Sequence, residues 1–337
     1  MRDDEILRYI GPPLRSIPLG SPFGQRYVPP VDDIHASVGG GPELYGNPDA
    51  VGEVLFEKGG FDAAIVTAPN RLVRSDRRHE VAVMRATNEW LAASWLQSRH
   101  GERFRASIDV SPTNVAAAIK EIERWAAHPG FVQVAVPLQV HSPYGEQEYF
   151  PILEAAASFG LPVAIHGDGG GGAELTPTMA GLPTKFVEYH TLFPLNAMVH
   201  LVSVITEGVF DRLPDLTLVL TDGCAAVMPP FLWRVDAKAR ALKEEMPWVG
   251  RRPTEYLNQV RFVPRRDDFP RDRNQLETMI HLARDGACLL YGSNYPMWDL
   301  VDLQTGDWPP ADLFPQPFFG ANALDTYPRL RPVRQAT

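Results

Sequence analysis

Short apolar runs rich in β-branched residues alternate along this chain with longer segments whose apolar positions recur at helical spacing. The short runs predict strands and the longer segments predict helices. This alternation is typical of parallel βα units. The predicted strands are residues 63–67, 104–110, 131–137, 162–166, 216–221, 259–263 and 288–292. The predicted helices include residues 77–99, 113–127, 146–159 and 229–245, with Gly130 and Gly160 as helix ends.

The predicted strands follow one another without a linker or a change of composition, which favours one (β/α)8 barrel of the TIM type over two doubly wound domains. With 337 residues, 45% of them hydrophobic, the chain can bury such a core. The pattern lacks one strand, which should precede the others. Residues 1–50 predict a wrapping arm rich in Gly and Pro, residues 51–306 the barrel, and residues 307–337 a Pro-rich tail that packs on it.

The charge balance argues against several classes of partner. A formal net charge of -9 and the absence of a dense Lys/Arg run argue against nucleic acid. The first residues are charged and lack a signal-peptide core, and no apolar stretch is long enough to span a bilayer, so we expect a cytoplasmic protein without a membrane partner. Cys224 and Cys288 adjoin apolar runs and are expected to be buried free thiols.

Residues that end strands deserve the most weight, because barrel enzymes carry their chemistry at the carboxyl ends of the strands. His166 ends the run 161–166, Asp222 ends 218–222, and Asn294 comes after the run 289–293. His166 fits a metal ligand and a hydrogen-bonded structural residue equally well. Asp222 fits a functional carboxylate and an Asp-Gly turn equally well. The glycine run 167–172 lacks the spacing of a phosphate cradle and predicts a mobile loop beside a pocket.

Other polar residues are weaker candidates. Asp33 and His35 have ligand-like spacing but lie in the Gly/Pro arm, where a surface position is the simpler interpretation. His190 and His200 fall in a helical segment and are most simply packed polar residues. Aromatic side chains at helical positions in residues 90–95 and 231–233 are explained by core packing.

Several ordered motifs carry a resemblance to a known family. They include Asn88-Glu-Trp-Leu, Leu161-Pro-Val-Ala-Ile-His166, Glu207-Gly-Val-Phe-Asp-Arg-Leu-Pro-Asp-Leu216, Pro229-Pro-Phe-Leu-Trp-Arg-Val-Asp236 and Gly292-Ser-Asn-Tyr-Pro-Met-Trp-Asp299. Together they resemble the metal-dependent amidohydrolases, in particular ACMSD-like decarboxylases and related hydrolases. The resemblance implies a metal held by an Asp/Glu-x-His pair on strand 1, a His ending strand 5 and an Asp after strand 8.

The chain departs from that ligand set in three places. His166 matches the strand 5 ligand, but the segment beginning at Glu5 resembles the family's segment immediately after strand 1, so the strand 1 pair is expected to be missing. Asn294 stands for the strand 8 Asp, and Met297 for a nearby His. Asp222 stands where relatives carry Glu or His. An amide is neither a general base nor a good ligand for a transition metal.

Three functions are compatible with this pattern. The first is a metal-poor subunit that assembles with a homologous, metal-complete amidohydrolase-fold chain. This would be similar to the smaller subunit of two-component oxygenases that hydroxylate 2-aminoisobutyrate, with a dinuclear metal in the partner. The second is a standalone hydrolase or decarboxylase in which one divalent Zn, Mn or Fe ion is held by His166 and Asp222, with Asp33, His35 and Asn294 as further candidates and Asp222 as the candidate catalytic residue. The third is a binding protein for a small molecule.

Overall fold

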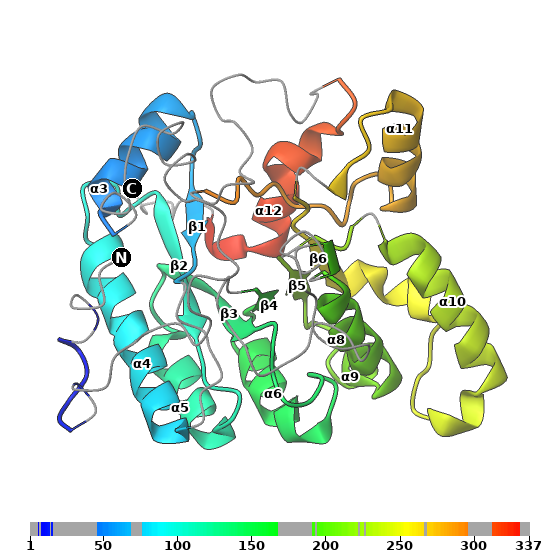
Figure 1. Cartoon of the computed structure of the whole chain (residues 1–337), viewed down its shortest axis with the longest axis horizontal. Coiled ribbons are helices and arrows are strands. Elements are labelled where there is room, and N and C mark those ends of the chain that lie inside the picture. Colours follow the sequence, from blue (N-terminus) through cyan, green and yellow to red (C-terminus); the bar gives the residue numbers. More distant parts are fainter. Residues whose placement is uncertain are drawn as a thin grey trace, which may run out of the picture.

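The computed structural model describes residues 6, 8–13, 15, 46–68, 76–167, 191–192, 194–221, 223–225, 227–265, 268–295 and 312–330. Its centre is a parallel sheet of six strands paired in the order of the chain (Figure 1). The strands are β1 Ala64–Val66, β2 Phe104–Asp109, β3 Phe131–Pro137, β4 Val163–His166, β5 Leu218–Leu220 and β6 Val260–Phe262. This curled parallel sheet agrees with the α/β part of the predicted fold class; the described residues form six paired strands rather than a closed (β/α)8 barrel.

Each of these six strands lies within a range predicted from the sequence. The seventh predicted strand, residues 288–292, is reduced to a parallel bridge between Leu289 and Phe262. The amide of Leu290 still donates to the carbonyl of Phe262 at 2.8 Å, so the chain runs alongside β6 at this point. The first part of the chain, where a preceding strand was expected and where Asp33 and His35 lie, is outside the described residues for the most part.

Four predicted helices are also present. They are α4 Arg77–Trp90, which continues as a wider turn Leu91–Trp95, α5 Val115–Trp125, α6 Phe150–Ser158 and α10 Met228–Ala241. The other α-helices of the described part are α3 Pro48–Gly52, α8 Leu195–Thr206, α9 Val209–Arg212, α11 Arg273–Leu282 and α12 Ala321–Thr326. A π-helix lies at Glu53–Lys58. Short 3₁₀ helices lie at Gln147–Tyr149, Lys243–Glu245, Pro253–Gln259, Gln316–Phe319 and Pro328–Leu330.

Side-chain capping explains where several helices begin. The Asp76 carboxylate accepts from the amides of Arg78 and His79 at the start of α4, and the Asn114 side chain caps α5. Gly160, with φ +63°, comes after α6 in the left-handed conformation that glycine adopts without strain. The prediction for Gly130 was wrong, because α5 ends at Trp125 and Gly130 directly precedes β3. The turn between them is closed by hydrogen bonds from the His128 amide to the Trp125 carbonyl and from the Phe131 amide to the His128 carbonyl.

The two faces of the sheet pack against different partners. Every second residue along a strand, such as Ile108 of β2 and Val134 of β3, joins the large core beneath the surrounding helices. Helices α4, α5, α6 and α8 follow one another along that side in chain order (Figure 1). The alternate residues form a smaller inner cluster with Tyr327, which directly follows α12. Its buried members are Val132, Ala164, Val219, Leu290 and Tyr327.

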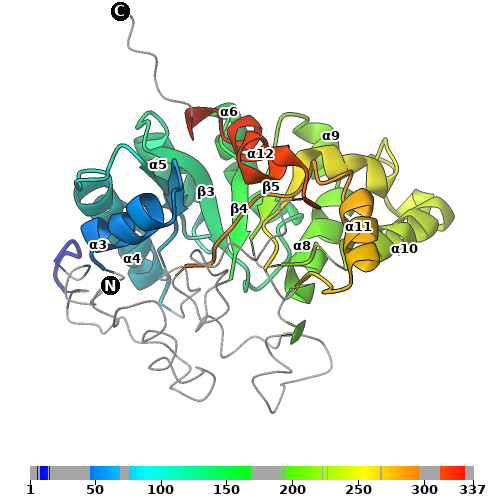
Figure 2. The same cartoon turned by 90° about the horizontal axis from the view of Figure 1, so that it is seen from above.

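The segment after α11 closes the inner face. In Figure 2, α12 lies between the group of α3, α4 and α5 and the group of α9, α10 and α11. The Tyr327 hydroxyl donates to the Gln133 side chain at 2.7 Å, and burial raises the pKa of Tyr327. The Arg329 guanidinium donates to the carbonyls of Ala126 and Phe131. Residues near the end of the chain thus bind the start of β3 and the residue after α5, which lie about 200 positions earlier in the sequence.

Two further expectations can be compared with the structure. Cys224 and Cys288 are both buried free thiols, as predicted. Burial raises the pKa of the Cys288 thiol to about 11. Among the described residues there is no helix that has both the length and the apolar character needed to cross a membrane.

Candidate functional site

The candidate site lies where the inner-face residues reach the carboxyl ends of the strands. Val163 and Ile165 of β4 pack into the outer core and Ala164 into the inner cluster, so His166 falls on the inner face. By the same alternation Thr67 follows β1 and Thr221 follows β5 on that face. The parallel sheet therefore gathers an imidazole and two hydroxyls at one end, as predicted for His166 from its position at a strand end.

His166 is bound on both its side chain and its backbone. Its Nε2 atom lies 3.4 Å from the Thr67 hydroxyl oxygen, across 99 positions of sequence. Its carbonyl accepts from the amide of Leu138 at 2.9 Å, which extends the pairing of β3 and β4 by one residue. This contact with Thr67 is long for a hydrogen bond.

The β5 end shows how the chain turns beside His166. The Thr221 hydroxyl and amide both bind the Ile165 carbonyl, at 3.0 and 3.2 Å. Asp222 lies outside the described residues, but Gly223 has φ +86°, in the left-handed region. A Cβ atom at Gly223 would lie 2.8 Å from both carboxylate oxygens of Asp268. Glycine is therefore required here by backbone conformation and by the close approach of Asp268.

Asn294 has an unusual backbone conformation. Its φ is +53°, a value that L residues adopt rarely and that Asn and Asp adopt more easily than most. The Ser293 hydroxyl accepts from the amide of Tyr295 at 3.2 Å, which tightens the turn around it. Burial raises the pKa of Tyr291 to about 12 and raises the pKa of Tyr295. Met297 lies outside the described residues.

The sequence proposes more metal ligands than the described part of the chain contains. A catalytic zinc-type site takes three protein ligands. Within the described part of the chain, no group of three or more His, Cys, Asp or Glu side chains could hold a metal ion. Of the candidates, His166 and Asn294 are described, whereas Asp33, His35 and Asp222 are not. The described residues therefore do not by themselves fit a catalytic ion.

The connection after β3 is held by a buried histidine. His200 on α8 donates from Nε2 to the Leu138 carbonyl at 2.7 Å and accepts at Nδ1 from the amide of Tyr144 at 3.2 Å. Burial lowers the pKa of His200 to about 4, so the imidazole is neutral at pH 7. The Tyr144 hydroxyl donates to the Pro137 carbonyl at 2.7 Å. His200 is thus a packed polar residue, as predicted; His190 lies outside the described residues.

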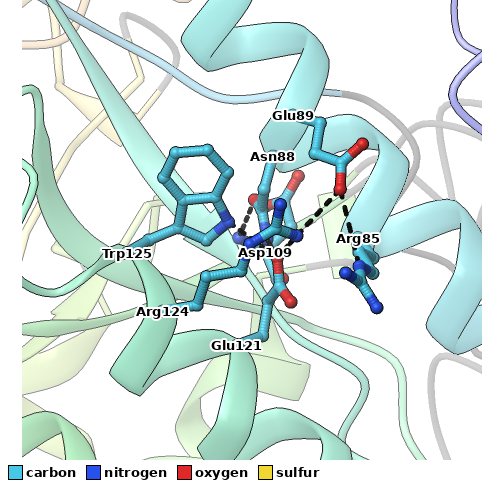
Figure 3. A network of polar contacts seen from close by, with 7 residues as sticks. All are labelled: Arg85, Asn88, Glu89, Asp109, Glu121, Arg124 and Trp125. Atoms are coloured by element: carbon cyan, nitrogen blue, oxygen red, sulfur yellow. Dashed lines mark hydrogen bonds and ion pairs between the residues drawn. The ribbon is translucent and has the colours of Figure 1, made fainter.

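The end of β2 is held by the polar network shown in Figure 3. The Asn88 amide on α4 donates to the carbonyl of Asp109 and accepts from its amide, both at 2.8 Å. β1 pairs with β2 only as far as Ala106, so Asn88 takes the place of a neighbouring strand at Asp109. Glu121 on α5 accepts from Asn88 and from the Trp125 indole, which links two helices to this strand end.

Three polar residues near these strand ends were missed in the sequence. Glu80 is fully buried and accepts from the hydroxyls of Ser111 and Thr113. Gln139 follows β3 by two residues, so the strand-end rule applied to His166 would have found it, whereas Asp268 lies six residues beyond β6. Glu80 carried no such signal, because an acidic residue in the first turn of a helix is explained by the helix dipole alone.

Comparisons with known proteins agree with this architecture. The family model described as "Amidohydrolase" matches residues 58–329. No curated protein matches the chain. An amidohydrolase structure from Mycobacterium avium subsp. paratuberculosis K-10 is 21% identical, with a TM-score of 0.68 over 85% of this chain and 75% of that one.

Two decarboxylase structures are similar to the same extent. A dihydroxybenzoic acid decarboxylase from Polaromonas sp. JS666, with bound manganese and 2-nitroresorcinol, is 19% identical and covers 86% of this chain and 90% of its own, with a TM-score of 0.66. A 2,6-dihydroxybenzoate decarboxylase from Rhizobium is 20% identical and covers 89% and 96%, with a TM-score of 0.65. At these identities the likeness establishes the fold alone.

Proposed function

We propose, because this chain belongs to the amidohydrolase family, that it is a hydrolase or decarboxylase acting on a small molecule with a carboxyl or carboxamide group. The observation that carries this proposal is the position of His166 at the carboxyl end of β4, 3.4 Å from the Thr67 hydroxyl. Imidazole and hydroxyl groups bind carboxyl oxygens, and barrel enzymes use this end of their strands for chemistry.

The similar structures support a small organic acid as the substrate class. Two of them are decarboxylases of dihydroxybenzoates, and the one from Polaromonas contains manganese. Any metal dependence in the present chain would rest on Asp222, Asp33 and His35 together with His166. Asn294 supplies only a neutral amide oxygen.

The proposed chemistry requires a proton to be moved. In a decarboxylation the bond to the carboxylate carbon breaks, CO2 leaves, and the electron pair stays on the substrate carbon, which then takes a proton. We assign this proton transfer to Asp222, the residue directly after Thr221. Thr221 is fixed through its hydroxyl and its amide to the Ile165 carbonyl, so the residue before Asp222 has a defined position.

The test uses the purified chain alone, stripped with a chelator and then supplied with Mn²⁺. Release of CO2 from 2,6-dihydroxybenzoate and hydrolysis of benzamide are measured for the wild type, His166→Ala, Asp222→Asn and His281→Ala. His281 is the control. It is exposed on α11 and pairs with Asp285, which lies just after that helix. We expect both site variants to lose turnover by about 100-fold or more, while His281→Ala stays unchanged. No turnover by the wild type with either probe and with Zn²⁺, Mn²⁺ or Fe²⁺ would reject a standalone enzyme.

A second candidate function is supported by the surface. Five large apolar side chains between residues 199 and 248 are at least 40% exposed: Val199, Val227, Trp233, Leu242 and Trp248. A contiguous exposed apolar patch marks an interaction surface, and we propose that these side chains contribute to one. Together with Asn294, they favour a subunit that assembles with a homologous amidohydrolase-fold chain. That partner would carry a complete, dinuclear metal site and perform the chemistry, such as hydroxylation of a small amino acid.

Co-purification with such a homologue tests this second candidate. Trp233→Asp on α10 should abolish assembly, because burying a carboxylate in an apolar interface is costly. Phe159→Asp, at a side chain that is 41% exposed after α6, is the matched control and should leave assembly intact. A wild-type chain that turns over substrate alone, or a Trp233→Asp variant that still assembles, would count against the partner.

A further inference from the structure

Two glutamines on the same strand and the same face have opposite hydrogen-bonding states. Val134, Val136 and Leu138 pack into the outer core, so residues 133, 135, 137 and 139 fall on the inner face of β3 and its extension. Gln133, near the amino end, donates to the Ser107 hydroxyl at 2.8 Å and accepts from Tyr327 at 2.7 Å. Gln139 lies beyond the carboxyl end, on the side of His166.

The Gln139 amide is shielded from solvent but is not paired. Neither its nitrogen nor its oxygen has a hydrogen-bonding partner within the described part of the chain, and both atoms are inaccessible to water. A buried amide without partners lowers the stability of a fold, and native proteins rarely retain one. Gln133 shows that the same strand can satisfy a glutamine fully, so the state of Gln139 calls for a partner beyond the part of the chain that the structure describes.

The backbone next to Gln139 is fixed in place. The amide of Leu138 donates to the His166 carbonyl, and the carbonyl of Leu138 accepts from His200 at 2.7 Å. The carbonyl of Pro137 accepts from Tyr144. The backbone that leads into Gln139 is therefore held in place, and its position is tied to that of His166 on the neighbouring strand. An unsatisfied amide carried by a fixed backbone can act as a recognition group at lower ordering cost.

We infer that Gln139 is a specificity-determining residue that binds a substrate group presenting a hydrogen-bond donor and an acceptor side by side. This inference rests on the proposed function. The glutamine nitrogen donates and its oxygen accepts, so a carboxamide, or a carboxylate with a hydroxyl on the neighbouring carbon, satisfies both atoms. A plain carboxylate offers acceptors alone and leaves the glutamine oxygen unpaired. A site built to pair with a polar group rejects the analogue that lacks it.

The first test measures the stability of the chain without ligand. Gln139→Leu and Gln133→Leu make the same chemical change on the same face of β3. We expect Gln139→Leu to keep or raise the melting temperature, because it removes a buried amide that has no partner. Gln133→Leu should lower it, because it leaves Ser107 and Tyr327 unpaired. A loss in Gln139→Leu as large as that in Gln133→Leu would mean that the Gln139 amide is already satisfied and would overturn the inference.

The second test measures binding by isothermal titration calorimetry on the chelator-stripped chain, which lacks the metal supplied in the turnover assay, with benzamide, 2-hydroxybenzoate and benzoate as probes. The wild type should bind benzamide or 2-hydroxybenzoate about tenfold more tightly than benzoate. Tighter binding of benzamide would identify a carboxamide as the substrate group, and tighter binding of 2-hydroxybenzoate would identify a hydroxy acid. Gln139→Leu should abolish the preference by weakening the preferred probe, with benzoate little changed. Equal binding of all three probes, no binding of any, or a preference that survives Gln139→Leu would refute the assignment.

Because binding is measured without turnover, failure of this inference and failure of the proposed function can be told apart. A chain that shows the Gln139-dependent preference but no turnover retains the recognition role and loses the enzymatic one. A chain that turns over substrate without the preference retains the enzymatic role and loses the assignment of Gln139.

Discussion

Replacing Asn88 by alanine should remove the side chain that substitutes for a strand at the end of β2. Asn88 is fully buried, and its amide makes two 2.8 Å hydrogen bonds to the backbone of Asp109. The substitution leaves the Asp109 amide and carbonyl without this partner. Each buried backbone group left unpaired costs about 1–3 kcal/mol, so we expect Asn88→Ala to lower the free energy of unfolding by about 2–6 kcal/mol.

The matched control lies in the same network (Figure 3). Arg85 also belongs to α4, but its ion pair with Glu89 spans 3.5 Å and its side chain is 59% exposed. Exposed pairs of this kind contribute about 0–1 kcal/mol, so Arg85→Ala should have little effect.

Thermal unfolding followed by circular dichroism measures both variants. With 337 residues, the entropy of unfolding is about 0.7 kcal/mol per degree. The expected loss for Asn88→Ala then corresponds to a melting temperature about 3–9 °C lower. Equal melting temperatures for Asn88→Ala and Arg85→Ala would refute the reasoning, because they would mean that the Asp109 backbone does not depend on the Asn88 amide.

Three further predictions concern other parts of the molecule. Burial lowers the pKa of His200 to about 4, below its ordinary value of 6.5, so the unfolded chain binds the proton first. Stability should therefore fall as pH drops from about 6.5 toward 4, by about 2 kcal/mol at pH 5 in urea titrations, and His200→Gln should lack this dependence. Because burial raises the pKa of Cys288 to about 11, mass spectrometry should find it unmodified by iodoacetamide at pH 8 until the chain is unfolded; rapid labelling would contradict its burial. Asn294→Val should cost about 1–3 kcal/mol more than Asn294→Gly in thermal melts, because a β-branched side chain is strained at φ +53° and glycine is not.

Much of the sheet was predictable because parallel strands are buried on both faces and therefore appear as continuous apolar runs. The run at residues 288–292 had the same appearance, yet pairing there is reduced to the bridge at Leu289. The pattern of apolar residues does not indicate how many residues of a segment form hydrogen bonds with the neighbouring strand. Helix α11 was not predicted, although Leu276, Met279 and Ile280 lie at helical spacing.

Site residues that end a strand could be predicted from the sequence. Residues that contact a strand end from a distant helix could not. His166 was found by its position in sequence. Glu80 meets Ser111 from 31 positions away, and Asn88 meets Asp109 from 21. Such pairings depend on how α4 packs against β2, which the local pattern does not encode. Gln139 could be located, but its unsatisfied amide could be recognised only in three dimensions.

The contact between Tyr327 and Gln133 has a consequence for how the chain folds during synthesis. The two residues are separated by 194 positions, so β3 leaves the ribosome long before the side chain that completes its inner face. At about 5–20 residues per second, this interval lasts on the order of ten seconds or more. For that time the apolar inner face of the nascent sheet lacks Tyr327, and a chaperone can bind it. The wait depends on the speed of the ribosome, so slowing translation of residues 134–326 should increase chaperone association and speeding it should reduce it.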